Sequence, residues 1–331
     1  MNYQHPSRQI CILLCSSRHV VELTKFGFVF AILAIILLGY ILKVMNVVKV
    51  ESANVLSRLV LYLFLPATIF SAFANVKINF EPLYVLFFAM GSFMAFVGYL
   101  AGYLVTKMIS LPLRTQGTLI IACGAMNIGL FVFPFFIAFL GLEGLVYAVI
   151  FDLGQAPFIY FIAVLIAKEY SRRADIAEMK RVASSGMKRF IANPLIWSIL
   201  GGLAVNLSGL SVIYTIFEPL LKLISNATVP LILILLGIFI EPKVERGKAI
   251  LSIILIRFLL SFFIALLFVL VTGISGRPRL TIFAVSMVPS AILTLVYSTE
   301  EGLDTKFAAS AVSVTILLGI FVTSAIFILL S

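Results

Sequence analysis

Two long apolar segments of this chain are interrupted near their middles, by NIGLFVFP at residues 127–134 and by MVPS at residues 287–290. Both interruptions contain proline, which cannot donate the helical hydrogen bond and whose ring collides with the preceding turn. Inside a bilayer, backbone groups freed in this way are tolerated only against protein or a water-filled cavity. The two stretches therefore predict broken membrane helices whose breaks face the protein interior.

The composition agrees with a membrane environment. The 331 residues are 62% hydrophobic and 11% charged, whereas a soluble protein carries about 25% charged residues. The apolar runs are long and continuous, which excludes the alternating pattern of a porin-type barrel. The predicted fold class is an all-α polytopic membrane protein.

Residues that support soluble-enzyme chemistry are scarce. The only two histidines, His5 and His19, lie in the N-terminal tail, and the three cysteines fit neither a disulfide framework nor a four-ligand zinc site. The sequence also contains no phosphate-binding loop of the Gly-x-x-x-x-Gly-Lys-Ser/Thr type. We therefore expect no enzyme activity, no cofactor and no metal site.

Apolar runs between polar punctuation give ten candidate membrane helices. A helix needs about 20 apolar residues to cross the hydrocarbon core. The fourth and fifth candidates almost touch at residues 141–143, which predicts a tight helical hairpin. The ten expected spans are 26–42, 55–74, 83–105, 117–140, 144–167, 194–213, 217–240, 250–273, 280–299 and 308–330.

The distribution of basic residues predicts which side of the membrane each connection faces. The one long connection, 168–193, holds seven Lys or Arg against three acids. Together with the other connections of the same side it holds 15 Lys or Arg, whereas the opposite connections hold three. Basic loops stay in the cytoplasm, so we expect 168–193 to be cytoplasmic and both termini to lie outside, in a multi-pass protein of the plasma membrane. Topology thus accounts for most of the net charge of +10, and we expect no nucleic-acid partner.

The basic connection divides the chain into two blocks of five spans, 26–167 and 194–331. An odd number of spans in each block places the second block upside down relative to the first. Prolines recur in matching spans of the two blocks, which suggests an inverted repeat. The first 25 residues, 1–25, are mixed and polar, and we expect a disordered extension or a start codon placed too far upstream. The recurring prolines are Pro66 with Pro230 and Pro134 with Pro289.

The broken spans, the fourth and the ninth, predict a site for a negatively charged ligand. Interrupted spans in corresponding places of two halves are the best sequence pointer to a transporter's binding site. The second half of each span is expected to start near its proline and to aim its N-terminus at the middle of the membrane. Helix N-termini carry free N–H groups and about half a positive charge. The C-terminal carbonyls of the first halves are expected at the same place, where they could serve a proton or sodium ion. The candidate substrate-binding residues are Asn127, Gly129, Pro134, Pro289 and Ser290.

Two charged residues lie deep inside predicted spans, where a charge is costly. Asp152 is either a carrier of a coupling proton or cation, or a structural partner for another polar group. Arg257 is either the partner of Asp152 or an anchor for the substrate, and we favour a structural role. Glu218 and Lys222 are four residues apart and predict a local helical ion pair.

At these residues the chain resembles the auxin efflux carriers, the PIN-like family that also occurs in bacteria and archaea. The resemblance covers about residues 26–330 and is most specific at Asn127-Ile128-Gly129 with Pro134, and at residues 287–304. It implies ten helices in two inverted repeats with crossed helices 4 and 9, as in bile-acid symporters and sodium/proton antiporters. It also implies a scaffold of spans 1, 2, 6 and 7 that forms homodimers, and a transport domain of the other six spans. The connection 168–193 lacks the long regulatory loop of many plant members, which makes kinase-type regulation and a plant-hormone role unexpected.

The function that these observations predict is secondary transport of a small organic anion, such as a carboxylate, across the lipid bilayer by alternating access. Either a proton or sodium would be the coupling ion. A sodium-coupled symporter or cation/proton antiporter of the same fold is the first alternative, although such carriers concentrate acids at the crossing. A membrane receptor or scaffold without transport is the second, and it would be expected to carry a sizeable soluble domain.

Overall fold

The computed structural model is helical in nearly all of the residues that it describes, which are 26–48, 50–76, 82–171, 186, 188, 190–208, 211–241 and 243–329. Within those residues the only β-type pairing is one isolated antiparallel bridge, between Met126 and Ser290. The N-terminal tail 1–25 and most of the basic connection 168–193 lie outside the described residues.

The helices follow one another with short connections, and several contain π-helical turns, marked η. In chain order they are Phe26–Val44, α2 (Val50–Leu59), η1 (Val60–Phe64), α3 (Leu65–Asn75), α4 (Pro82–Met108), α5 (Leu113–Gly124), η2 (Ile128–Val132), α6 (Phe133–Pro157), η3 (Phe158–Ile162), α7 (Ala163–Tyr170), α9 (Pro194–Ser208), α10 (Ser211–Phe239), α11 (Gly247–Ile254), η4 (Leu255–Leu260), α12 (Ser261–Thr272), α13 (Gly276–Ser286), α14 (Leu293–Glu300) and α15 (Thr305–Leu329).

Seven helices of the described part are long and apolar enough to cross a membrane, and α9 is a shorter apolar helix. This confirms an all-helical, multi-pass membrane protein. The remaining helices α5, α13 and α14 have 12, 11 and 8 residues, each too short to cross alone since a span needs about 20. They are the pieces of the two interrupted segments, so the predicted total of ten spans depends on counting each interrupted segment once.

The helical stretch Ile128–Tyr170 is divided at Gly141, whose backbone has φ 66° and ψ −161°. Residues with a Cβ rarely adopt this conformation, whereas glycine does so readily. The division falls at residues 141–143, where the sequence predicts a turn between two spans. Each of the two pieces is then the length of an ordinary membrane helix or half-helix.

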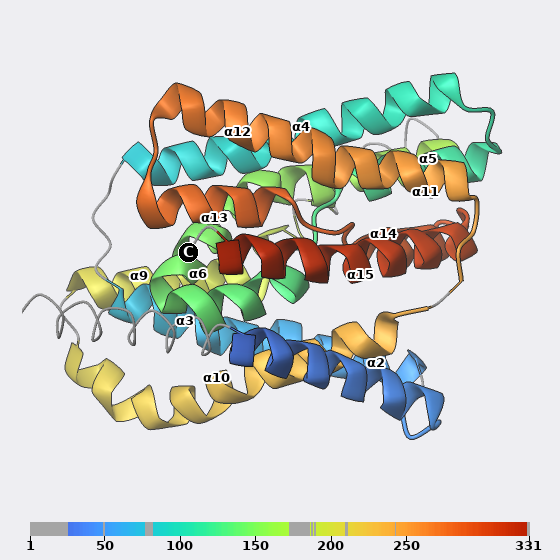
Figure 1. Cartoon of the computed structure of the whole chain (residues 1–331). Coiled ribbons are helices and arrows are strands. Elements are labelled where there is room, and N and C mark those ends of the chain that lie inside the picture. The colour runs from blue at the N-terminus through green and yellow to red at the C-terminus, as the bar shows by residue number, and fades with distance from the viewer. Residues whose placement is uncertain are drawn as a thin grey trace, which may run out of the picture.

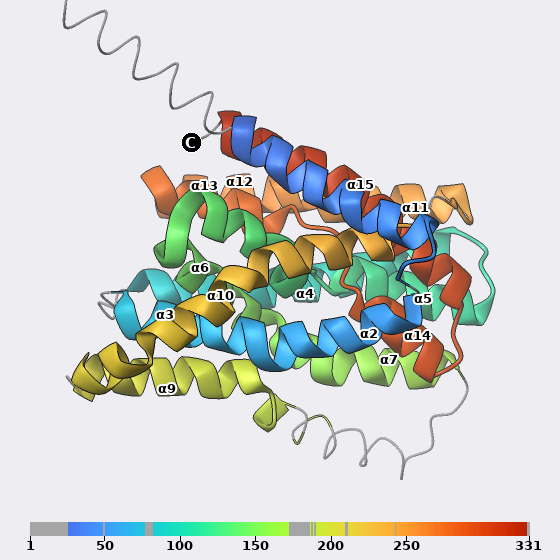
Figure 2. The same cartoon turned by 90° about the horizontal axis from the view of Figure 1, so that it is seen from below.

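The helices form two groups: α3 and α10 of the lower group lie in the lower part of Figure 1, α4, α11 and α12 of the upper group lie in its upper part, and α6, α9 and α15 lie between. The lower group contains Phe26–Val44, α3, α9 and α10, and both views place α3 between α9 and α10 (Figures 1 and 2). The Asn206 side chain of α9 donates to the carbonyls of Phe73, Ala74 and Val76 at the end of α3. Thr68 of α3 and Thr228 of α10 share a 2.8 Å hydrogen bond. Such interhelical bonds hold helices together where the surrounding lipid is as apolar as the side chains.

The upper group contains α4, α5, α6, α7 and α11 to α15, and its helices approach closely at small residues. A Cβ at Gly91 would lie 2.1 Å from the carbonyl oxygen of Phe151, and one at Gly154 would lie 2.1 Å from that of Phe88. These glycines bring α4 into direct backbone contact with α6, as small residues do in membrane proteins. The contact fixes the position of Asp152, which lies between the two close approaches.

Candidate functional site

The two interrupted segments touch each other at their breaks through backbone hydrogen bonds. The N–H of Asn127 donates to the carbonyl of Pro289 at 3.0 Å, and the N–H of Ala291 donates to the carbonyl of Ala125 at 2.9 Å. Each break therefore satisfies backbone groups that the other break leaves free. This pairing meets the requirement that irregular backbone at membrane depth be bonded within the protein.

Four helix ends converge where the breaks meet. The first halves, α5 and α13, end at Gly124 and Ser286, and the second halves begin at Ile128 and Leu293. Helix N-termini present N–H groups without intrahelical acceptors and a partial positive charge, whereas C-termini present carbonyls and a partial negative charge. The site thus offers binding groups for both signs of charge, and side chains decide which ends are accessible.

Gln155 of α6 supports the first break from the side opposite the second. Its Oε1 accepts from the N–H of Met126 at 3.1 Å, and its Nε2 donates to the carbonyl of Met126 at 3.0 Å. The side-chain amide thus forms the same pair of hydrogen bonds with Met126 that the backbone of a neighbouring β-strand would form. The same Nε2 donates to Oδ1 of Asp152 at 2.6 Å. Gln155 therefore couples the position of the break to the position of the acid.

Most of the second break is packed against other helices, and only its end, Ala291 and Ile292, lines a cavity. Residues 287–292 are all buried. The N–H of Ser290 donates to Oγ1 of Thr315 on α15 at 3.1 Å, and the Ser290 hydroxyl donates to the carbonyl of Ala122 on α5 at 2.7 Å. A Cβ at Gly319 of α15 would lie 3.0 Å from Cδ of Pro289. Close packing of α15 thus holds this extended segment in place.

Pro134 lies away from the breaks, within the first turn of α6. The second half of the interrupted segment begins at Ile128 as the π-helix η2, and continues into α6 without a second interruption. A proline ring collides with the carbonyl one turn earlier, and a wider π-helical turn relieves that collision. The same arrangement occurs at Pro66, which follows the π-helix η1. The helix therefore starts six residues earlier than a start at the proline would give.

A cavity of about 220 Å³ opens beside the breaks, between the two groups of helices. One wall comes from α2, η1, α3 and α9, and the other comes from both breaks and from α6. Most of its lining is apolar. Its polar lining side chains are Ser57, Asn127, Asp152, Tyr160 and Asn193. An apolar pocket with a few polar groups is typical of a site for a small organic molecule.

Two polar groups of the cavity are associated with the first break: Asn127 belongs to it, and Asp152 is joined to it through Gln155. The Asn127 side chain is 5% exposed, and its Nδ2 is buried with no hydrogen-bond partner among the described residues. Leaving a buried donor unpaired costs about 1–3 kcal/mol, so a ligand that accepts this hydrogen bond recovers that cost. Asp152 is half-buried and keeps one carboxylate oxygen on Gln155.

The predicted binding residues separate into two sets. Asn127 and Gly129 line the cavity, as does Asp152. Pro134, Pro289 and Ser290 lie outside its lining, because Pro134 belongs to the next turn of helix and the other two are covered by α5 and α15. The polar side chains Tyr160 and Asn193 complete the cavity, and Asn193 donates to the Tyr160 hydroxyl at 2.9 Å.

Arg257 does not pair with Asp152. Its side chain is 1% exposed, and it donates to the carbonyls of Val288 and Cys123 at 3.0 and 3.3 Å. Neither these acceptors nor the role of Gln155 is predicted by the sequence pattern. The sequence does show that Gln155 is a polar residue one turn after Asp152 and that Arg257 lies inside an apolar span. Both side chains bind backbone groups, which a pattern of residues does not reveal.

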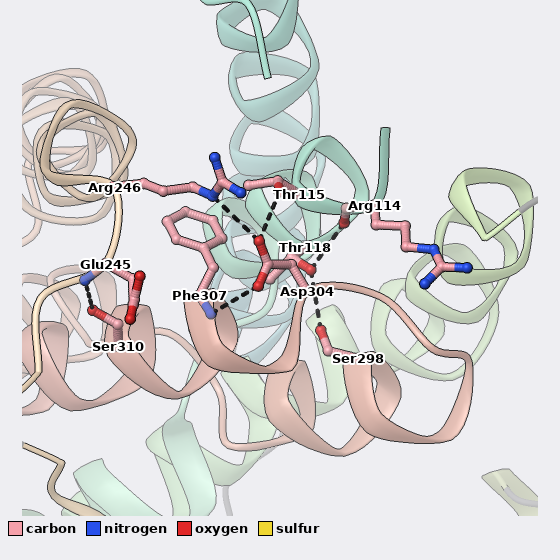
Figure 3. Close-up of polar contacts among 9 residues, drawn as sticks. All are labelled: Arg114, Thr115, Thr118, Glu245, Arg246, Ser298, Asp304, Phe307 and Ser310. Atoms are coloured by element: carbon pink, nitrogen blue, oxygen red, sulfur yellow. Dashed lines mark hydrogen bonds and ion pairs between the residues drawn. The ribbon is translucent and has the colours of Figure 1, made fainter. Parts of the chain in front are cut away.

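A second polar cluster lies around Asp304, at the start of α15 (Figure 3). The Asp304 carboxylate accepts from the Thr115 hydroxyl of α5 at 2.7 Å and from the N–H of Phe307 at 3.1 Å, and it forms a 3.3 Å ion pair with Arg246. In the same region the N–H of Glu245 donates to the Ser310 hydroxyl. The cluster ties the start of α5 to the connection before α11.

The predicted ion pair of Glu218 and Lys222, on α10, is present with a 2.9 Å distance between Oε1 and Nζ.

Comparison with known proteins identifies the family. Residues 25–327 match the family model described as membrane transport protein. An uncharacterized transporter from Methanocaldococcus jannaschii is 30% identical over 295 residues, which cover 87% of this chain and 92% of that protein. An uncharacterized transporter from Methanothermobacter thermautotrophicus is 28% identical over 295 residues, covering 88% of this chain and 94% of that protein. The chain belongs to the membrane transport protein family, which is the family of the auxin efflux, or PIN-like, carriers.

Proposed function

We propose that this membrane transporter moves a small organic anion, such as a carboxylate, by secondary transport with alternating access. The observation that carries the proposal is the junction of the two breaks beside a cavity. Half-helix N-termini at Ile128 and Leu293 and the unpaired amide of Asn127 all lie at the cavity. Helix N-termini and amide donors together favour an anion.

The size and lining of the cavity narrow the cargo further. A volume of about 220 Å³ is below the ~300–1,000 Å³ of pockets for drug-sized ligands. The apolar lining favours a cargo with a hydrocarbon body and a charged end. A small carboxylate meets both requirements, since its oxygens accept hydrogen bonds from Asn127 and from backbone N–H groups while its carbon atoms contact the apolar wall.

Asp152 is the proposed carrier of a coupling proton. An ionised carboxylate in the cavity repels an anionic cargo, and a proton on Asp152 removes that repulsion. Binding of the anion and of a proton would therefore be linked. Tyr160 is the other titratable side chain in the described cavity lining. Sodium remains the alternative coupling ion, and a sodium-coupled symporter or cation/proton antiporter of the same fold is the alternative function.

The proposed arrangement in the membrane uses all ten predicted spans. Counting α5 with η2 and the first part of α6, and α13 with α14, as single interrupted spans gives two blocks of five, 26–167 and 194–331, in inverted orientation. The basic connection 168–193 would be cytoplasmic in the plasma membrane. The lower helix group of Figure 1 would be the scaffold that forms a homodimer, and the upper group would move against it.

Counterflow in proteoliposomes tests the proposal. Vesicles containing the purified protein are loaded with one unlabelled carboxylate at a time, and entry of the same labelled compound is measured with and without sodium and a pH gradient. We expect exchange of at least one small carboxylate, acceleration by an inward proton gradient, and no exchange of organic cations. Exchange of cations in place of carboxylates would favour the antiporter.

A further inference from the structure

Arg257 is a fully buried cation without a carboxylate partner in the described part of the chain. It lies in the π-helix η4, and its side chain is 1% exposed. A buried charge is costly to remove from water unless it is paired or fully hydrogen-bonded. The ion pairs of the described residues involve other basic side chains. The guanidinium is therefore stabilised by backbone groups at Nε and Nη1, while its Nη2 has no hydrogen-bond partner among the described residues.

The two carbonyls that accept from Arg257 belong to the two interrupted segments. Nε donates to Val288, which follows the end of α13, and Nη1 donates to Cys123, in the last turn of α5. These carbonyls lie at the C-terminal ends of the first halves, where the helix dipole is negative. One rigid, planar cation thus joins both C-terminal ends. Without Arg257, a bound coupling cation could interact with these two carbonyl groups.

Arg257 acts from the side of the junction that faces away from the cavity. It is absent from the cavity lining. Its neighbours in η4 and α11, Ile256 and Ile253, pack with Leu119 and Cys123 of α5 in an apolar cluster separate from the main core. Arg257 therefore has no route to the cargo, and its influence must pass through the positions of the breaks.

We propose that Arg257 is a positioning residue, a built-in cation that fixes the C-terminal ends of both first halves and so holds the two N-termini at the cavity. At each of these ends one carbonyl is occupied by the protein's own cation, which favours the positive ends as the place where the cargo binds. For transport, this inference rests on the proposed function. For the integrity of the junction it stands alone, because the hydrogen bonds exist whatever the cargo is.

The test uses Arg257→Lys, Arg257→Gln and Arg257→Ala in the full chain, with two readouts. The first is the melting temperature of the purified protein in choline, sodium or guanidinium chloride at millimolar concentration. The second is carboxylate counterflow. Arg58→Ala is the matched control, since Arg58 is an exposed arginine at the end of α2.

We expect the wild-type melting temperature to be the same in sodium and in choline. Arg257→Ala should melt lower and be partly restored by guanidinium, which can occupy the vacated position, whereas Arg58→Ala should not respond. Arg257→Lys keeps the positive charge but loses the planar set of N–H donors that reaches both carbonyls. It should therefore fold but lose roughly tenfold to 100-fold of transport, since a displacement of ~1 Å can cost ~100-fold. Arg257→Gln should lose more than Arg257→Lys.

Two results would overturn the inference. They are wild-type melting and transport in Arg257→Gln, and no response of Arg257→Ala to guanidinium. If the wild-type protein exchanges no carboxylate, the proposed cargo is wrong, but the melting temperatures still decide the role of Arg257. If Arg257→Ala cannot be purified, the difference between the Lys and Gln variants decides it.

Discussion

The two breaks are similar in sequence position but differ in what they expose. The first break, at residues 125–127, is short, presents Asn127 to the cavity, and is supported by the side chain of Gln155. The second, at residues 287–292, is longer and is held by Arg257, Thr315 and the first break; it contributes only the apolar side chains of Ala291 and Ile292 to the cavity. Helix breaks at matching positions of the two halves therefore need not have the same chemistry. The first break contains the candidate ligand groups, and the second supports them.

Gln155→Leu should have the largest effect, because it removes both partners of Met126. Each orphaned buried group costs about 1–3 kcal/mol, so we expect the free energy of unfolding to fall by ~2–6 kcal/mol. Thermal denaturation of the purified protein measures this. Gln155→Glu keeps only the acceptor and places a second carboxyl against Asp152, so it should also be destabilised. Equal stability of Gln155→Leu and wild type would contradict the support assigned to this side chain.

Asn127→Ala should abolish most transport while leaving folding intact. The side-chain amide has no partner among the described residues, so its removal breaks no internal hydrogen bond of Nδ2. A hydrogen bond to a charged ligand is worth about 1.5–3 kcal/mol, which corresponds to roughly a 10- to 100-fold loss of carboxylate counterflow. Size-exclusion profiles and melting temperature should match the wild type. Normal transport by this variant would remove Asn127 from the site.

Asp152→Asn should flatten the pH dependence of carboxylate transport. Asparagine keeps an acceptor oxygen for the Gln155 amide but cannot take up a proton. The measurement is counterflow across a series of pH values from about 4, near the ordinary pKa of a carboxyl group, to neutral pH, with Tyr160→Phe as the control for the other titratable group of the cavity. An unchanged pH profile would assign Asp152 to structure.

Ser290→Ala should have the smallest effect, although Ser290 matches Asn127 in the comparison of the two breaks. It removes one hydrogen bond to the carbonyl of Ala122, worth about 0.5–1.5 kcal/mol of stability. The backbone N–H of residue 290 keeps Thr315 as its acceptor. Carboxylate counterflow should stay close to that of the wild type, because Ser290 lies outside the cavity lining. A loss as large as that of Asn127→Ala would mean that the second break also binds cargo.

The sequence was sufficient for the class of the fold and for the places where the helices break. Long apolar runs and two interior prolines require those features wherever the chain folds in a bilayer. The exact starts of the second halves were not predictable, because Pro134 is accommodated by the π-helix η2 and not by an interruption. Whether a proline ends, bends or widens a helix depends on tertiary packing around it.

The division of the candidate residues between cavity and support was also beyond the sequence. Asn127 and Ser290 look equivalent as polar residues beside a break, yet Ser290 is covered by α5 and α15. Arg257 and Gln155 bind backbone carbonyls and N–H groups, which leave no signature in side-chain patterns. Such roles follow only from three-dimensional placement.

The central claim is that the junction of the breaks binds an anion, and Asn127→Asp tests it most directly. This substitution keeps the shape of the side chain and adds one negative charge at the cavity. Carboxylate counterflow by Asn127→Asp, measured beside Asn127→Ala, should fall below that of the alanine variant because the new charge repels the cargo. Carboxylate exchange at the wild-type rate, or a gain of cation exchange without loss of the carboxylate, would contradict the claim.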